Sequence, residues 1–81
     1  DTASLEKAGE NGDLNSLYQL SIRKISEGDY DTAMDNLLTI MQKDRKFEDD
    51  IGRKTLLKIF DMLGDDPRVE TYRRKMFNYL Y

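Results

Sequence analysis

A stripe of apolar residues between Tyr30 and Met41 constrains the fold of this chain more than any other feature of its sequence. The stripe repeats at the three- and four-residue intervals that place side chains on one face of an α-helix. Its members are Tyr30, Ala33, Met34, Leu37, Leu38 and Met41. A β-strand would need alternation of apolar and polar residues, and no segment shows it. The sequence therefore predicts an all-α fold.

The segment before this stripe also has helical spacing. Asp13 is a suitable N-cap, and a helix from there runs to about Glu27, where Gly28 interrupts it. Asp29 then caps the helix that carries the stripe. The apolar face of the first helix consists of Leu14, Leu17, Tyr18, Ile22 and Ile25.

Two more helices are expected in the second half. Asp49 or Asp50 can cap a third helix, which Gly64 ends. Asp66 followed by Pro67 is typical of the start of a fourth, because proline at the first helical position loses no hydrogen bond. The inner face of the third helix is Leu56, Ile59, Phe60 and Leu63, with Leu57 and Met62 on its flanks. The inner face of the fourth is Val69, Tyr72, Met76, Tyr79 and Leu80.

The two tight turns lie 36 residues apart, at Glu27-Gly28-Asp29 and Leu63-Gly64-Asp65. Short turns between helices of similar length indicate two antiparallel helical hairpins. The spacing is close to the period of tetratricopeptide repeats. We therefore expect degenerate repeats of this kind over residues 13–81, and a linker or the frayed end of a preceding helix over residues 1–12.

The match to that repeat pattern is incomplete. Ser21 stands where Gly or Ala is usual, Lys24 where Tyr is usual and Arg45 where the closing Pro is usual. The second hairpin matches less well than the first.

Composition excludes several classes of function. The chain has no Cys and no His, which removes disulfides, thiolate chemistry and imidazole acid–base catalysis. The acidic group Asp44, Glu48, Asp49 and Asp50 lacks the ligand spacing and central glycine of an EF-hand. We therefore predict no enzymatic activity, no cofactor and no metal site.

Charge and hydropathy also limit the choice of partner. The net charge is −3: residues 1–50 carry 12 acids and 6 bases, whereas residues 51–81 carry 4 acids and 7 bases. So few bases, interleaved with acids, do not favour nucleic acid. No apolar run approaches the ~20 residues that span a bilayer. The expected partner is another protein.

Residues from about 14 to 81 resemble a known family, chiefly in the order of several short motifs. These are Lys43-Asp44, Asp49-Asp50, Arg53-Lys54-Thr55, Leu63-Gly64, Tyr72-Arg73-Arg74-Lys75-Met76 and the final Leu80-Tyr81. Together they resemble the C-terminal end of the co-chaperedoxins, YbbN-like fusions of a thioredoxin-like domain with tetratricopeptide repeats. The departures are Ile51-Gly52 before Arg53 and the weak match of residues 1–12.

This resemblance implies a non-catalytic interaction domain of a bacterial cytoplasmic co-chaperone, or holdase. Its partners would be unfolding client proteins, a GroEL-type chaperonin and a DnaK-type chaperone. A thioredoxin-like domain would precede the chain. Because the chain begins at Asp1 without Met, we expect it to be part of a longer protein.

The last ten residues hold four of the eight aromatic side chains, together with a basic run. Exposed aromatic and arginine side chains commonly anchor protein partners. The candidate partner-binding residues are Arg73, Arg74, Phe77, Tyr79 and Tyr81. Three alternatives stay open: the rings pack inward and the charges are solvated, the hairpins are a purely structural cap on a larger repeat stack, or two copies pair as a homodimer through their terminal faces.

Overall fold

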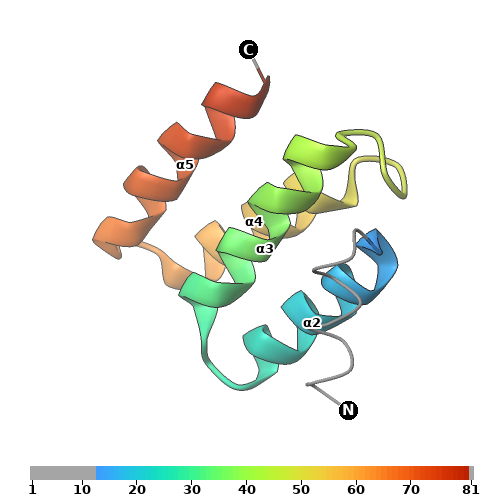
Figure 1. Ribbon diagram of the computed structural model, residues 1–81. Helices are drawn as coiled ribbons and strands as arrows, with labels where there is room; N and C mark the ends of the chain where they lie inside the picture. The colour runs from blue at the N-terminus through green and yellow to red at the C-terminus, as the bar shows by residue number, and fades with distance from the viewer. Residues whose placement is uncertain (1–12, 81) are drawn as a thin grey trace.

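The computed structural model describes residues 13–80, which form four α-helices joined by short turns (Figure 1). The helices are α2 (Leu14–Ser26), α3 (Tyr30–Lys43), α4 (Ile51–Leu63) and α5 (Pro67–Leu80). This part of the chain contains no strand, and its helices follow one another as the hairpins α2–α3 and α4–α5. The prediction of an all-α fold of two helical hairpins is confirmed. Residues 1–12, where a linker or frayed helix was predicted, and Tyr81 lie outside the described residues.

Local signals set the start of three helices. The Asp13 carboxylate accepts the backbone N–H of Ser16 at 3.2 Å, and the Asp29 carboxylate accepts that of Thr32 at 3.3 Å. Each bond satisfies one of the amide groups that the first turn of a helix leaves without a partner. At the start of α5, the Asp66 carboxylate accepts the backbone N–H of Arg68 in the same way. The turns at Gly28 and Gly64 have φ of 81° and 62°, a region that favours glycine.

The start of α4 differs from the prediction that Asp49 or Asp50 caps it. Asp50 precedes the helix, but its side chain makes no capping hydrogen bond. Its carboxylate instead accepts a hydrogen bond from Arg53 at 2.6 Å. The reason is the backbone, because Glu48, Asp49 and Asp50 all have positive φ, between 47° and 66°. An N-cap side chain needs an extended backbone to reach the first turn of the helix.

Helix α3 is the centre of the packing. It lies between the others in Figure 1 and contacts α2, α4 and α5. Ala33, Met34 and Leu37 on α3 have no exposed surface, and the same holds for Leu56 and Ile59 on α4. The predicted stripe on α3 is therefore the core around which the other helices pack.

A close contact joins α3 to α4 at Gly52. A Cβ atom at this position would lie 3.1 Å from Met41 Cγ and 3.3 Å from the carbonyl oxygen of Leu37. These distances are shorter than ordinary van der Waals contact, so a side chain at position 52 would push α3 and α4 slightly apart. Ile51-Gly52, a departure from the resembled family, is thus part of the helix–helix interface here.

The two hairpins are packed differently. Helices α2 and α3 contact each other extensively, whereas α5 contacts α4 even less than it contacts α3. On α3 of the first hairpin, Met34 and Leu37 are fully buried. The residues 36 positions later, Glu70 and Arg73, are charged and exposed. The second hairpin is therefore more open than the first.

Two residues of the predicted inner faces are exposed instead. Tyr79 on α5 is 41% exposed, and Ile22 on α2 is 43% exposed. Helix α5 is covered on one side only, so it buries the narrow stripe of Val69, Tyr72 and Met76. At 3.6 residues per turn, Tyr79 falls at the margin of that stripe.

Replacing Gly52 with valine should destabilise the protein by about 1–3 kcal/mol, because the added atoms would overpack the α3–α4 contact. The free energy of unfolding, measured by chemical denaturation, tests this. Lys58→Val places the same side chain on the exposed side of α4 and should cost less than 1 kcal/mol. Equal effects of the two substitutions would contradict the close contact.

Replacing Glu48 with glycine should stabilise the protein by about 1 kcal/mol. Glu48 has φ of 47°, a left-handed conformation that is sterically strained for any residue with a Cβ atom. Thermal unfolding of Glu48→Gly measures the gain. Lys46 in the same loop does not have a positive φ, so Lys46→Gly relieves no strain, and we expect it to lower stability.

Candidate partner-binding surface

Helix α5 carries the predicted binding residues, and Arg68 fixes its N-terminal end. The Arg68 guanidinium donates hydrogen bonds to the Asp66 carboxylate at 2.8 and 3.1 Å, and to the Asp31 carboxylate on α3 at 2.7 Å. The Asp66 carboxylate also accepts the backbone N–H of Arg68 at 2.9 Å, as an N-cap does. One arginine thus links the capped start of α5 to α3.

These contacts change the protonation equilibria of both partners. Hydrogen bonds from the side chain and backbone of Arg68 lower the pKa of Asp66 from 3.8 to about 2. The hydrogen bonds to Asp66 and then to Asp31 raise the pKa of Arg68. Both shifts favour the charged forms, so the folded state stabilises this group of charges at neutral pH.

Tyr72 is the polar group on the buried side of α5. Its ring is 8% exposed, and its hydroxyl donates to the carbonyl oxygen of Asp31 at 3.5 Å. Burial, followed by the nearby carboxylates of Asp35 and Asp31, raises the pKa of Tyr72. The hydroxyl stays protonated, and the ring belongs to the contact of α5 with α3 rather than to an exposed surface.

The opposite side of α5 carries a shallow hollow of about 210 Å³, which we call the α5 notch. It is lined by Glu70, Arg73, Arg74 and Phe77. The Arg74 guanidinium lies 3.6 Å from the Glu70 carboxylate, and both side chains are more than three-quarters exposed. Such an exposed ion pair contributes little to stability, so either residue can pair with another charged group at little cost.

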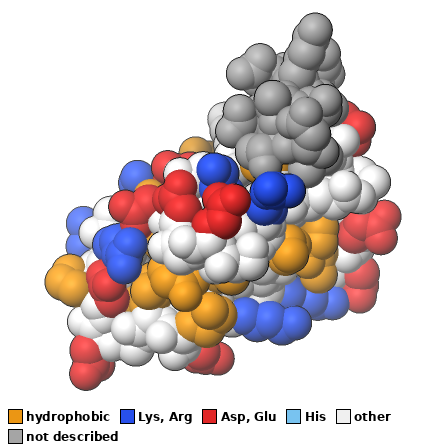
Figure 2. All heavy atoms as spheres, turned by 90° about the horizontal axis from the view of Figure 1, so that it is seen from below, with side chains coloured by type: hydrophobic (Ala, Val, Ile, Leu, Met, Phe, Trp, Pro, Cys, Tyr) orange, Lys and Arg blue, Asp and Glu red, His pale blue; other side chains and the backbone are white. Residues whose placement is uncertain are grey.

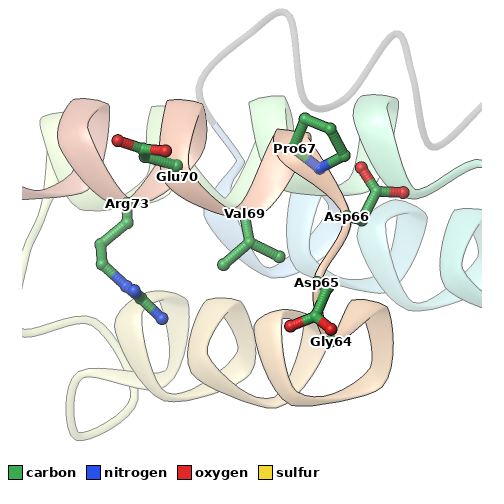
Figure 3. A pocket seen from close by; sticks show the side chains of 7 residues that line it. All are labelled: Gly64, Asp65, Asp66, Pro67, Val69, Glu70 and Arg73. Atoms are coloured by element: carbon green, nitrogen blue, oxygen red, sulfur yellow. The ribbon is translucent and has the colours of Figure 1, made fainter.

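Arg73 connects the notch to α4. Its guanidinium carbon lies 5.5 Å from the centre of the Phe60 ring, a cation–π distance. Figure 3 shows the Arg73 and Val69 side chains reaching from α5 toward α4. The contact holds the Arg73 side chain in one direction, so less conformational entropy is lost if a partner binds it.

A second hollow, of about 460 Å³, adjoins the notch at the turn between α4 and α5 (Figure 3). It is lined by Gly64, Asp65, Asp66, Pro67, Val69, Glu70 and Arg73. Glu70 and Arg73 line both hollows, so the two form one open surface along α5.

The structure brings three of the five predicted residues together. Arg73, Arg74 and Phe77 line the notch, and Phe77 is 47% exposed. Tyr79 is exposed but is not among the residues lining the notch, because two positions along a helix correspond to more than half a turn. Tyr81 lies outside the described residues.

Sequence reasoning missed Glu70 as part of this surface. It placed Phe60 on the inner face of the third helix, which is confirmed by its 4% exposure, but did not predict its contact with Arg73. The repeat offset was a usable signal, since Glu70 falls 36 residues after the core residue Met34. A charged residue in the second repeat, at a position whose equivalent in the first repeat is in the core, indicates a face that the second repeat leaves uncovered.

Exposed apolar side chains are spread over several helices. The large ones are Ile22, Leu57, Met62, Phe77 and Tyr79. On the face seen in Figure 2, hydrophobic side chains reach the surface in small patches among Lys, Arg, Asp and Glu. Isolated apolar groups of this kind are common on protein surfaces. Phe77 lies in a hollow together with two arginines.

Within residues 13–80, no group of three or more Asp, Glu, Cys or His side chains could hold a metal ion. Within the same residues, no helix is both long and apolar enough to cross a membrane.

Comparison with known proteins identifies a repeat family. A family model described as "Tetratricopeptide repeat" matches residues 1–81. No curated protein and no solved structure matches the chain.

The stabilising effect of Asp66 should disappear in acid. The pKa of Asp66 is lower in the folded state than in the unfolded state. Its contribution to the free energy of unfolding is therefore fully present above the ordinary pKa of 3.8 and is lost as pH falls through about 2. Asp66→Asn should therefore melt below the wild type at pH 5, and the difference should shrink toward zero near pH 2. Thermal unfolding between pH 5 and 2 measures it. Asp61→Asn, which removes an exposed carboxylate from α4, should show no such converging difference.

Proposed function

Since the chain belongs to the tetratricopeptide repeat family, we propose that it is a protein-binding module whose contact surface is the outer side of α5. The family suggests a protein–protein interaction domain, and its repeats are generally non-catalytic. The function would then lie in the surface that α5 presents rather than in a catalytic group.

The exposure of Phe77 is the observation that carries this proposal. Its side chain is 47% exposed on a helix whose other exposed residues are mostly charged or polar. Aromatic rings bury a large area on binding and lose little conformational entropy. They are accordingly frequent among the residues that dominate binding energy.

The charges beside Phe77 favour an acidic partner. Arg73 and Arg74 line the notch with Phe77, and Glu70 is the only acidic residue among its lining residues. Such a surface attracts negatively charged proteins and speeds their association at low salt. Arg73 is also held in place by the Phe60 ring, which prepares it for contact.

We further propose that the partners are chaperones and their clients, as the resemblance to co-chaperedoxins implies. On this proposal, a GroEL-type chaperonin or a DnaK-type chaperone binds α5, and the chain follows a thioredoxin-like domain in a bacterial cytoplasmic protein. The support is the order of the short motifs between Lys43 and Tyr81.

One observation favours a second candidate, the purely structural cap. Terminal units of repeat proteins carry a polar outer face, which keeps the array soluble. Glu70, Arg73 and Arg74 give α5 such a face. On this proposal the hairpins stiffen a larger protein and bind no partner of their own.

Replacing Phe77 with alanine should weaken binding to a purified GroEL-type chaperonin or DnaK-type chaperone by at least tenfold, as expected for an exposed aromatic anchor. Tyr79→Ala should weaken it less, because Tyr79 lies outside the notch. Surface plasmon resonance with the immobilised 81-residue chain measures both. Asn78→Ala, an exposed change between the two rings, is the matched control and should bind as the wild type does.

The structural-cap candidate predicts a different result. Wild type and variants would then show no measurable binding to either chaperone. Binding that Phe77→Ala and Tyr79→Ala both leave unchanged would place the contact elsewhere and contradict the proposed surface.

A further inference from the structure

The notch corresponds, through the internal repeat, to a surface that is buried in the first hairpin. Adding 36 to four positions on α3 gives the four residues that line the notch. The pairs are Met34 and Glu70, Leu37 and Arg73, Leu38 and Arg74, and Met41 and Phe77. The four α3 residues are at most 5% exposed, whereas the four on α5 are all exposed. A surface that is covered in one repeat is therefore open in the next.

The structure shows how α4 helps to cover the α3 surface. Helix α4 places Gly52 directly against Met41 and the main chain of Leu37, with an added Cβ reaching 3.1 Å from Met41 Cγ. The lack of a side chain lets the α4 backbone lie on α3. The equivalent place on α5 is beside Phe77 and the main chain of Arg73. A helix with a small residue at the contact would fit there in the same way.

The charges of the notch set it apart from its α3 counterpart. Three of its four residues are charged, where α3 has Met34, Leu37 and Leu38. An apolar helix would take the Arg73 guanidinium and the Glu70–Arg74 ion pair out of water without offering them a hydrogen-bond partner, and burying an ion in this way costs several kcal/mol. A carboxylate facing each guanidinium removes that cost, because arginine and carboxylate form paired hydrogen bonds.

We infer that the α5 notch binds an acidic amphipathic α-helix of a partner protein, with a small residue against Phe77 and carboxylates facing Arg73 and Arg74. This inference rests on the proposed function, because it specifies the kind of partner that the outer side of α5 accepts. The partner helix would lie on α5 in the way that α4 lies on α3. The exposed Glu70–Arg74 pair would open to let the partner's carboxylate replace Glu70.

Three peptides made from the sequence of α4 (Ile51–Leu63) can test this, since α4 is the helix that lies on the equivalent surface. Each is stapled on its outer face, because isolated helices of 13 residues are marginally stable. The acidic probe carries Arg53→Glu and Lys58→Glu, which flank the Gly52 face. The second probe adds Gly52→Leu to these changes. The third keeps the α4 sequence unaltered and is basic.

Fluorescence anisotropy with the 81-residue chain should show that the acidic probe binds best. The basic probe should bind at least tenfold more weakly, because it opposes Arg73 and Arg74 with like charges. The Gly52→Leu probe should bind at least fivefold more weakly, because its side chain keeps the two helices apart.

Protein variants show whether the notch is the binding site. Phe77→Ala should weaken the acidic probe at least tenfold. The double variant Arg73→Glu with Arg74→Glu should reverse the order and prefer the basic probe. Asn78→Ala is the control on the same helix and should leave the order unchanged. Circular dichroism confirms that each variant stays helical, since all four positions are exposed.

The inference would be overturned if the three peptides bound equally, if none bound, or if the notch variants left binding unchanged. The last result would mean that the acidic probe displaces α4 from α3. Loss of chaperone binding in Phe77→Ala, combined with failure of these peptides, would reject the helical partner and keep the proposed function. Failure of both would reject both.

Discussion

The contact between α3 and α4 at Gly52 is the constraint on which the rest of the structure depends. It lets the backbone of α4 lie against Leu37 and Met41, and so helps to complete the cover of the most buried helix. Helix α5 then packs on α3 through Tyr72 and Arg68. With no disulfide available, a chain of this size relies on such tight packing. A single side chain at position 52 would disturb it more than any exposed substitution.

The helices were predictable because their signals are local. The apolar stripe of α3, the capping carboxylates of Asp13, Asp29 and Asp66, and the turn glycines all act within a few residues of their own position. The backbone at Asp50 was not predictable, because its positive φ depends on how the loop after α3 must turn to place α4. The exposure of Tyr79 could not be predicted either. The helical pattern predicts the apolar face of α5, but it does not show how much of that face the other helices cover.

The candidate surface was predictable in part for the same reason. Helical spacing places Arg73, Arg74 and Phe77 on neighbouring positions, so their meeting in the notch follows from α5 being a helix. The part played by Phe60 depends on α4 and α5 lying apart by the length of an arginine side chain, and no local pattern encodes that separation. The repeat offset, in contrast, does encode which faces change from apolar to charged, as Glu70 shows.

The open second hairpin has a mechanical consequence. Its two helices are each attached to α3, α4 through Gly52 and α5 through Arg68 and Tyr72, while contact between them is slight. The gap spanned by Arg73 can therefore widen or narrow without breaking either attachment. Such movement would change how closely a ligand helix can approach α5, whereas Arg73 and Arg74 would still face its charges. Recognition through those charges weakens as salt is added.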